Sequence, residues 1–559
     1  YSADSSLPAK LLPQCEILPN YSYQNPDFRL RNHTRISSSR CYLGLRKVVC
    51  LSKEEDNVEE SKLSKWQLAS YGAPAMPLAM NGLILATYLP AVYADAEGFG
   101  LALGAMGFIV MLSRIFDGVT DPIVGYWSDR ITTRWGRRKP FIVIGLPIWV
   151  LGVWFLWVPP IEFTDVTFLG YEFNNGYPWL LFALILFYAG STIKDVPYSA
   201  WGAELSTQYN ERTLIMSWRE GFSVAGSLIG ALTPAIIVFF GYTKPTDAVY
   251  FLSIYIVIVS PIFIINNLWS VPEYPVKETR KEKLPILEGL QYVWDNEPYR
   301  KLVIIFLFST IGAAMTNTLS FFFVKHILLA GDLYGFYLAP YFISQIIAIP
   351  LWFSLSRKIG KHRATMAAIG WYALWSCFIP VIAIMDQSYF DLFQVGNLLA
   401  FLPADTYQAA LTYFEGIPTG KFIFFIAIMC LKGSAIGALS ALPLAMAADV
   451  IDLDSARTGK KQGGAYFSIW GMTRKLAYAV GLFVGTSAAV IVGFNSLADP
   501  FNTTNSAESL LWLACLYSII PALFKFVAMP LLWNYSLTEE RLAEIQAEIR
   551  ENELKAAQT

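Results

Sequence analysis

The sequence predicts an all-α membrane protein with twelve transmembrane helices in two six-helix halves. The prediction rests on the composition, on the number of long apolar runs, and on the loops in which Lys and Arg gather. Of the 559 residues, 55% are hydrophobic and only 15% are charged, with a mean hydropathy of +0.43. A soluble domain carries about 25% charged residues. This composition argues against a set of soluble domains and indicates a polytopic helical membrane protein.

Residues 1–62 are polar and contain neither a spanning run nor the apolar core of a secretory signal. The sequence starts with Tyr1 rather than Met, which leaves the natural start open. We expect this segment to be a disordered cytosolic tail or sequence upstream of the real start. A cleavable organelle-targeting segment is the alternative, because residues 29–40 are rich in Ser and Arg.

From Trp66 onward, twelve apolar runs are long enough to cross about 30 Å of hydrocarbon. Their extents are 66–94, 101–127, 140–158, 178–202, 214–240, 246–270, 301–326, 332–354, 364–386, 420–448, 464–493 and 507–533. The stretch between Asp386 and Lys421 is ambiguous, because Asp391, Pro403 and Asp405 interrupt its apolar pieces. We interpret it as a long external loop with an interfacial segment.

Basic residues gather in the loops that follow the second, fourth, sixth, eighth and tenth runs. They are Arg130, Arg134, Arg137, Arg138, Lys139, Arg212, Lys277, Arg280, Lys281, Lys283, Arg300, Lys301, Arg357, Lys358, Lys361, Arg363, Arg457, Lys460 and Lys461. The opposite loops hold little besides Lys244. Loops rich in Lys and Arg stay in the cytoplasm, so both termini are predicted to be cytoplasmic. We expect the cell membrane, or an organelle membrane if residues 1–62 are a targeting segment.

A weak internal repeat divides the chain into two halves. The basic segment 129–138 follows the second run, and 356–363 follows the eighth, which is the equivalent place in the second half. Parallel six-helix halves are the major facilitator plan, with substrate bound near the midplane between them. The predicted units are the tail 1–62, a first bundle 63–270, a cytoplasmic middle loop 271–300, a second bundle 301–537 and an amphipathic cytoplasmic tail 538–559.

The run 101–127 contains two carboxylates, Asp117 and Asp121, four residues apart and therefore about one turn apart on one helix face. Arg114 lies three residues before Asp117 on the same face. Charges at membrane depth are costly, so they face a protein-lined or aqueous interior, pair with one another or bind an ion. We interpret this stretch as half of a Na⁺ or H⁺ site, with Arg114 as a pairing charge.

Asp195 lies well inside the run 178–202 and is followed by Pro197, which can free a backbone carbonyl nearby. It is the candidate third ligand of the cation. The alternative is a helix end near water, because Glu204 and Gln208 follow closely.

Basic residues at membrane depth are candidates for the substrate site. Arg219 lies about five residues inside the run 214–240, beside Glu220, so snorkelling of both to the membrane surface is the alternative. Lys432 lies near mid-depth in the run 420–448. It is expected either to pair with an Asp or to contact an anionic substrate.

The later apolar runs contain three further basic residues. Arg474 and Lys475 lie about one-third into the run 464–493, and one of them is expected to point to the cavity. Lys325, near the external end of its run, is predicted to be an interfacial anchor.

No pattern in the sequence supports an enzyme or a resident cofactor. It has no phosphate-cradling Gly-Lys-Ser/Thr loop, no His-Glu-x-x-His motif and no Gly-x-Ser-x-Gly elbow. The six cysteines show no metal-ligand spacing, and three histidines are too few for a His-rich metal site. The expected partners are a small-molecule substrate and membrane lipids, without nucleic acid, and we expect a monomer.

Together, the motifs resemble those of the glycoside–pentoside–hexuronide:cation symporters, the melibiose-permease type of major facilitator. The animal lysophospholipid transporters belong to the same broad group. The resemblance covers about 63–537. Its most specific part is Arg114-x-x-Asp117-x-x-x-Asp121-Pro122 followed by Arg134-Trp-Gly-Arg-Arg-Lys-Pro140. Tyr71-Gly72, Asp195-Val-Pro197 and Asp449-Val-Ile-Asp452 also match.

The resemblance implies a role for each matching residue. Asp117 and Asp121 would bind the coupling cation, and Asp195 would serve both the cation and the substrate. Arg219 matches a basic residue of the substrate site. Lys475 matches a lysine linked to the cation site.

One departure from the family concerns the first run. Galactoside-binding members carry a Lys-Asp pair soon after Tyr-Gly, whereas here the stretch 73–80 is uncharged and Asn81 is the nearest polar candidate. This argues against a melibiose-like substrate and leaves the cation site whole.

The expected function is Na⁺- or H⁺-coupled symport of a sugar, glycoside or related small solute by alternating access. A carrier of lysolipids or other amphiphiles is the alternative within transport. A membrane receptor or sensor with transporter ancestry is the alternative of another class.

Overall fold

The computed structural model describes most of the chain beyond the N-terminal tail. It covers residues 63–131, 133–168, 170–206, 209–273, 294–398, 419–458, 463–502 and 504–533, with the single residues 535 and 544. The predictions for residues 1–62, for most of the middle loop and for the C-terminal tail lie outside these ranges. Within them, twelve helical segments are long and apolar enough to cross a membrane, which confirms the predicted number.

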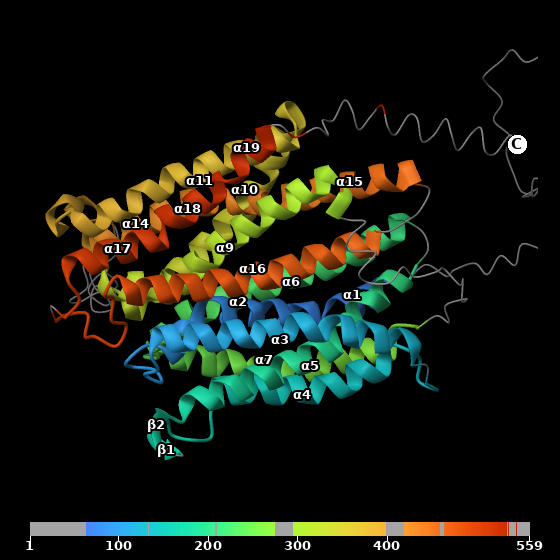
Figure 1. Cartoon of the computed structure of the whole chain (residues 1–559), viewed down its shortest axis with the longest axis horizontal. Helices are drawn as coiled ribbons and strands as arrows, with labels where there is room; N and C mark the ends of the chain where they lie inside the picture. The colour runs from blue at the N-terminus through green and yellow to red at the C-terminus, as the bar shows by residue number, and fades with distance from the viewer. Residues whose placement is uncertain are drawn as a thin grey trace, which may run out of the picture. The chain divides into compact units, whose positions relative to one another are not determined.

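The first six spans contain seven α-helices (Figure 1). They are α1 (Lys65–Gly72), α2 (Ala75–Tyr93), α3 (Leu103–Arg130), α4 (Lys139–Trp157), α5 (Gly176–Glu204), α6 (Tyr209–Ile237) and α7 (Pro245–Ser270). The 3₁₀ turn η1 (Val238–Phe240) extends α6, and a hairpin of β1 (Asp165–Phe168) and β2 (Tyr171–Asn174) connects α4 to α5. The first apolar run is two helices because Pro74, which lacks a backbone N–H, stands at the boundary.

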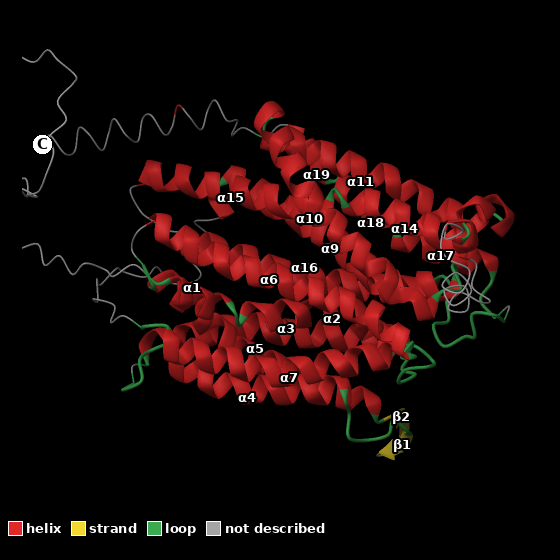
Figure 2. Cartoon of the chain, turned by 180° about the vertical axis from the view of Figure 1, so that it is seen from behind, coloured by secondary structure: helices red, strands yellow, loops and turns green. Residues whose placement is uncertain are grey.

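The second half contains the last six spans and, after the ninth span, the short segments η3 and α12 (Figures 1 and 2). Its described elements follow in chain order. They are α9 (Glu297–His326), η2 (Gly331–Leu333), α10 (Tyr334–Ile359), α11 (Lys361–Ile384), η3 (Gln387–Phe393), α14 (Thr419–Gly433), α15 (Ile436–Thr458), α16 (Gly463–Ile491), α17 (Ala507–Tyr517), α18 (Ile519–Phe526) and α19 (Ala528–Trp533), with the four-residue helix α12 (Val395–Leu398) after η3. The tenth run is broken between α14 and α15, and the twelfth is broken twice.

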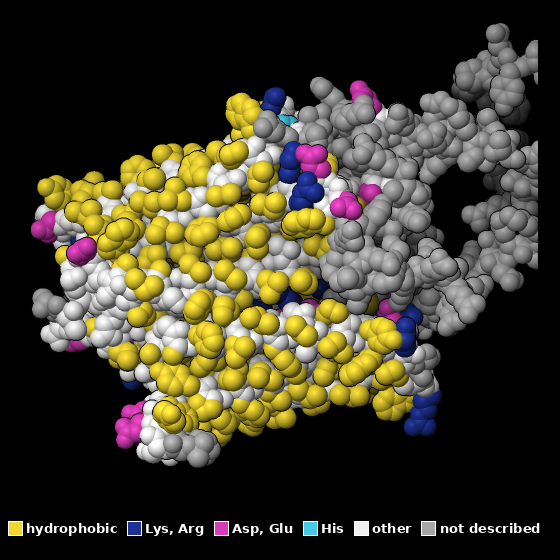
Figure 3. Space-filling view, viewed as in Figure 1, with side chains coloured by type: hydrophobic (Ala, Val, Ile, Leu, Met, Phe, Trp, Pro, Cys, Tyr) yellow, Lys and Arg dark blue, Asp and Glu magenta, His cyan; other side chains and the backbone are white. Residues whose placement is uncertain are grey.

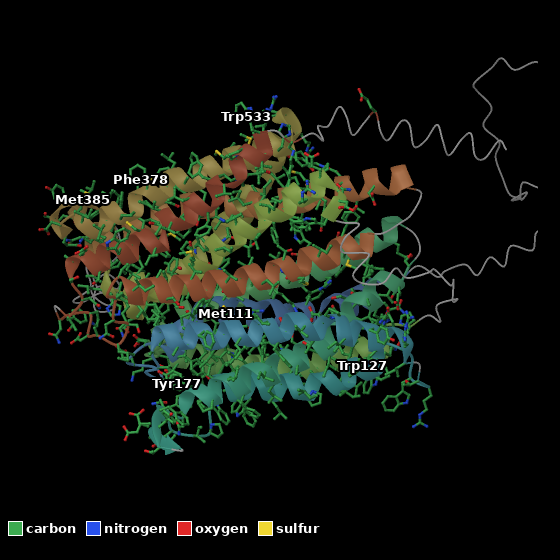
Figure 4. The ribbon with its side chains drawn as sticks, viewed as in Figure 1. Met111, Trp127, Tyr177, Phe378, Met385 and Trp533 are labelled. Carbon is green, nitrogen blue, oxygen red and sulfur yellow. The ribbon has the colours of Figure 1, made fainter. Side chains whose placement is uncertain are left out.

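The outer surface of the bundle is apolar, as a membrane requires. Figure 3 shows hydrophobic side chains covering most of this face, with charged ones mainly towards its two ends. Phe378 on α11 and Trp533 on α19 lie at the outer edge (Figure 4), and their side chains are exposed. With no water in the bilayer core, helices satisfy their backbone groups internally. The chain is an integral, multi-pass membrane protein.

The two halves meet along three helix pairs: α3 with α16, α2 with α9, and α6 with α10. Glycines allow two of these close approaches. A Cβ at Gly335 of α10 would lie 2.8 Å from the backbone nitrogen of Ala235 on α6, and one at Gly107 of α3 would overlap Thr486 of α16. The backbones of α10 and α6 are therefore in direct contact at Gly335, and the side chain of Thr486 packs against the backbone of α3 at Gly107.

A buried ion cluster joins the halves on the side opposite the start of α1 and the end of α19, which we call the far side. Lys325, in the last turn of α9, donates to both carboxylate oxygens of Asp95 at 3.0 and 2.9 Å and to Glu97 at 2.9 Å. The side chains of Lys325 and Asp95 are 8% and 1% exposed. Burial raises the pKa of Asp95, and its contacts with Lys325 act in the opposite direction. The prediction that Lys325 is an interfacial anchor is wrong, because its ammonium points into the protein.

We expect Lys325→Met to loosen the far side. Removing one partner of a buried ion pair leaves the other charge uncompensated, which costs roughly 3–5 kcal/mol. In a background without native cysteines, a cysteine replacing Tyr334 reports on this interface, since Tyr334 of α10 stacks edge-on against Tyr88 of α2. Its labelling by a membrane-impermeant maleimide should speed up in Lys325→Met. Lys244→Met, an exposed cation nearby, is the control, and equal labelling in all three proteins would contradict the expectation.

Candidate cation and substrate site

The carboxylates of α3 lie at the contact between the halves. Asp117 and Asp121 are one turn apart on α3, and the side chain of Asp117 is only 4% exposed, whereas that of Asp121 is 30% exposed. A nearly buried carboxylate needs hydrogen-bond donors or a counter-charge. The structure supplies both, from two other helices.

Lys475 comes from α16 of the second half and reaches both carboxylates. Its Nζ donates to Asp117 Oδ1 at 2.9 Å and also to Asp121 Oδ2. The three residues predicted from the sequence as cation ligands and counter-charge are thus brought together. A single ammonium lies where a bound cation would contact both aspartates.

Thr192 of α5 is the second donor group, and sequence reasoning missed it. Its Oγ1 lies 3.0 Å from Asp117 Oδ1 and 3.0 Å from Asp121 Oδ1, and its side chain is buried. Thr192 precedes Asp195 by three residues, so the two lie on neighbouring positions of one helix face. That spacing is the signal that points to it, although a threonine inside an apolar run is common.

Arg114 contacts the same cluster from the side. Its Nη1 lies 3.7 Å from Asp117 Oδ2. The guanidinium carbon lies 4.6 Å from the ring centroid of Tyr188 and 5.4 Å from that of Tyr478. The two rings hold the planar guanidinium in place. Arg114 lies next to the carboxylate of Asp117, as the sequence predicted.

Asp195 is close along the chain but has its own partners. It accepts from Ser191 at 2.6 Å and pairs with Lys194, whose side chain is 1% exposed and lies over the ring of Trp149. Within the described residues, no group of three or more His, Cys, Asp or Glu side chains is close enough to hold a metal ion. The predicted three-carboxylate site is therefore not assembled in this conformation, and the role of Asp195 stays a prediction.

The other candidate substrate residues lie in different places. Arg219 of α6 donates to Ser199 at 3.5 Å and lies 5.5 Å from the Tyr198 ring centroid. Glu220 is exposed. Asn81 of α2 is buried, and its Oδ1 has no hydrogen-bond partner among the residues that the structure describes.

Lys432 does not take the expected Asp partner. It is fully buried in the second half, lying 4.7 and 5.1 Å from the ring centroids of Tyr372 and Tyr517, and its Nζ has no hydrogen-bond partner among the described residues. Of its two expected roles, pairing with an Asp is not seen among the residues that the structure describes, and contact with an anionic substrate stays a prediction. The rotation of α14 directs this side chain towards α11 and α17.

The family described as MFS/sugar transport protein matches residues 70–539. This range contains all twelve spans apart from the first residues of α1. The chain belongs to the MFS/sugar transport family. The resemblance inferred from the motifs is thereby confirmed, together with the major facilitator fold.

Relatives and solved structures agree with this family. The sodium-dependent lysophosphatidylcholine symporter 1-A of Danio rerio is 23% identical over 89% of this chain and 90% of its own length. The glucuronide carrier protein homolog of Escherichia coli is 23% identical over 84% and 91%. The crystal structure of a D-xylose-proton symporter superposes with a TM-score of 0.56 over 84% of this chain and 97% of its own, at 14% identity. At that identity the superposition shows the fold alone.

The contribution of the Thr192 hydroxyl to cation binding in this MFS/sugar transport chain can be tested by comparing two Thr→Val variants. We expect Thr192→Val, which keeps the shape and removes the hydroxyl, to weaken the apparent affinity for the coupling cation by about 10- to 150-fold, since hydrogen bonds to charged groups contribute about 1.5–3 kcal/mol. The measurement is the cation concentration that gives half-maximal uptake. Thr233→Val is the control, because that hydroxyl donates only to Ile229 of its own helix, and an unchanged cation dependence in Thr192→Val would contradict the prediction.

Proposed function

We propose that the chain is a cation-coupled symporter that carries a sugar, glycoside or related small solute by alternating access. The observation that carries the proposal is the contact of Lys475 with both Asp117 and Asp121. It places a positive charge between two carboxylates at a contact between the halves. Binding Na⁺ or H⁺ there requires Lys475 to leave, so the cation changes a contact across the interface.

The rest of the site fits this reading. Hard oxygen donors of Asp117, Asp121 and Thr192 suit Na⁺, and the same carboxylates can take up a proton instead. Two of the relatives that match over most of the chain are named as symporters or carriers, and one of them as sodium-dependent. Asp195 would join the site after a rearrangement that releases it from Lys194.

The halves would rock about this contact. In the structure the far side is closed by Asp95 and Lys325 and by the packing of α10 on α6. This closure supports a conformation that opens towards the opposite side, which the loop charges predict to be cytoplasmic. The cell membrane is the proposed location.

A lysolipid or other amphiphile is the second candidate substrate. The observation that favours it is the uncharged α2 segment, where the buried Asn81 is the polar residue and no carboxylate is present to hold sugar hydroxyls. Relatives named as lysophosphatidylcholine symporters match over nine-tenths of this chain.

Uptake into proteoliposomes with imposed Na⁺ or pH gradients tests the proposal. Glycosides, hexuronides and a lysophospholipid are offered in turn. Accumulation that follows one gradient and collapses when that gradient is dissipated is the expected result. Solute entry that never depends on either gradient would overturn the coupling.

A further inference from the structure

The second half contains two buried lysines that the cation site does not use. Lys432, in the last turn of α14, is fully buried, and Lys525, in the last turn of α18, is 4% exposed. Both ammonium groups lie against the ring of Tyr372 on α11, at 4.7 and 4.9 Å from its centroid. Two positive charges therefore share one aromatic ring inside the protein, in the part of the bundle that lies away from α3 and α5 (Figures 1 and 2).

Neither ammonium pairs with a carboxylate from the part of the chain that the structure describes. Lys525 donates to the carbonyl and to the hydroxyl of Ser309 on α9, at 3.0 and 3.1 Å. The Nζ of Lys432 has no hydrogen-bond partner among the described residues. The rings of Tyr372 and Tyr517 attract this ammonium, but its three N–H donors still need acceptors. A buried charge without acceptors or a counter-charge is strongly destabilising.

The break between α14 and α15 frees backbone carbonyls close to Lys432 along the chain, but other donors already bond to them. The indole of Trp371 donates to the carbonyl of Leu431 at 2.8 Å, and the hydroxyl of Ser434 donates to the same oxygen at 2.7 Å. The indole of Trp352 donates to the carbonyl of Ser434 at 2.8 Å. These carbonyls are therefore not the acceptors that the lysine lacks.

The first half contains an equivalent lysine that does have a counter-charge. Lys194 lies on the fourth span of the first half, and its Nζ is 4.3 Å from the ring centroid of Trp149 on the third span. Lys432 lies on the fourth span of the second half and contacts Tyr372 on the third span of that half. Lys194 pairs with the next residue, Asp195, whereas the residue after Lys432 is a glycine. The second half thus repeats the lysine and the ring but not the carboxylate.

The group that compensates Lys432 must be small. The lysine is fully buried, and a Cβ at the following residue, Gly433, would lie only 2.8 Å from the ring of Tyr341 on α10. Tyr341 and Tyr372 are themselves buried. Such close packing favours an ion of one or a few atoms over a sugar or a lipid head group.

We propose that Lys432 and Lys525 bind a small monovalent anion, such as chloride, inside the second half. The anion would supply the negative charge that Asp195 supplies to Lys194 in the first half. Charge-assisted hydrogen bonds are strong, and the low dielectric of a protein interior increases the attraction between an ammonium and an anion. Such an anion would be resident, separate from the coupling cation on α3 and from the transported solute.

The experiment measures chloride binding by the full chain in detergent. Binding of radioactive chloride is measured in a gluconate buffer, since gluconate is too large for the buried position. Melting temperatures are compared in chloride, bromide and gluconate at equal ionic strength. Lys432→Met and Lys525→Met each remove one of the two ammonium groups. Lys244→Met, which removes an exposed cation outside the pair, is the control.

We expect the wild-type chain and Lys244→Met to bind chloride and to melt about 2 °C or more higher in chloride than in gluconate. Lys432→Met should weaken chloride binding by about tenfold or more, since hydrogen bonds to charged groups are strong. In gluconate this variant should melt at a higher temperature than the wild-type chain, because methionine fills a similar volume without a buried charge.

Lys525→Met repeats the binding test on the second ammonium, so the inference stays testable if Lys432→Met does not fold. Its chloride binding should also fall by about tenfold or more. Its melting temperature in gluconate should not rise, because it loses the two bonds to Ser309 as well.

Three results would overturn the inference. The first is a wild-type chain that binds no chloride. The second is a chloride-dependent melting shift that persists in Lys432→Met, which would identify a general salt effect. The third is displacement of the bound chloride by a transported solute, because the position would then belong to the substrate. Cation-coupled uptake is tested separately and does not depend on any of these results.

Discussion

Asp121→Asn is expected to abolish cation-driven uptake while leaving folded protein in the membrane. Asparagine keeps the shape of the side chain but removes the negative charge that a cation, or the Lys475 ammonium, is attracted to. Lys475 retains its hydrogen bond to Asp117, so the contact between α3 and α16 persists. Because Asp121 is 30% exposed, its loss should cost little stability, on the order of 1 kcal/mol.

The measurement compares two modes of transport in proteoliposomes. Accumulation driven by a Na⁺ or H⁺ gradient should fall by about 10- to 150-fold, since an interaction with a charged group contributes about 1.5–3 kcal/mol. Exchange of solute without a gradient should persist, which shows that the protein is folded. Asp247→Asn, in the first turn of α7 and outside the site, is the matched control. Undiminished gradient-driven accumulation by Asp121→Asn would remove Asp121 from the cation site.

Lys475→Gln is expected to have the opposite effect on cation binding. The lysine ammonium competes with the cation for the same carboxylate oxygens, so its removal should tighten cation binding by about tenfold or more. Without any cation, Asp117 then keeps only the 3.7 Å contact with Arg114 as an ion pair, and Asp121 loses its ion-pair partner among the described residues. The variant should then be less stable by up to about 3 kcal/mol, a value reduced from that of a fully buried pair because Lys475 is 22% exposed.

Thermal unfolding with and without Na⁺ distinguishes these effects. We expect a lower melting temperature for Lys475→Gln in Na⁺-free buffer and a larger Na⁺-induced increase than in the wild-type chain. Coupled uptake should still be lost, because cation binding no longer displaces a lysine ammonium from the contact between α16 and α3. Lys475→Arg, which keeps the charge, is the control. A Na⁺ response identical to that of the wild-type chain would show that Lys475 does not compete with the cation.

Much of the candidate site could be predicted from local pattern. Asp117 and Asp121 are four residues apart in an apolar run, and helix geometry alone places them on one face. Lys475 was expected opposite them through the family resemblance, and the structure places it there. Thr192 could not be singled out, because a hydroxyl inside an apolar helix usually bonds to its own backbone.

Two charged residues show where such reasoning fails. Lys325 was interpreted as an interfacial anchor from its place near a helix end, but Asp95 from the other half buries it. Lys432 was expected to pair with an Asp or to contact an anionic substrate, and the structure places it among the rings of its own half. In both cases the depth of the residue in the membrane can be estimated from sequence, whereas its direction around the helix axis cannot.

The sequence by itself determined the twelve spans, the two halves and the pair of acidic residues at membrane depth. The length of a hydrophobic run and the helical repeat are local properties of the sequence. The thickness of the bilayer and its lack of water mean that these properties decide which segments span the membrane as helices. The tertiary structure decided which charges meet. Lys475 is 358 residues from Asp117 along the chain, and the two meet only because α16 packs against α3 of the first half. Such contacts depend on how each helix is rotated and packed, which is set by side-chain fit across the whole bundle.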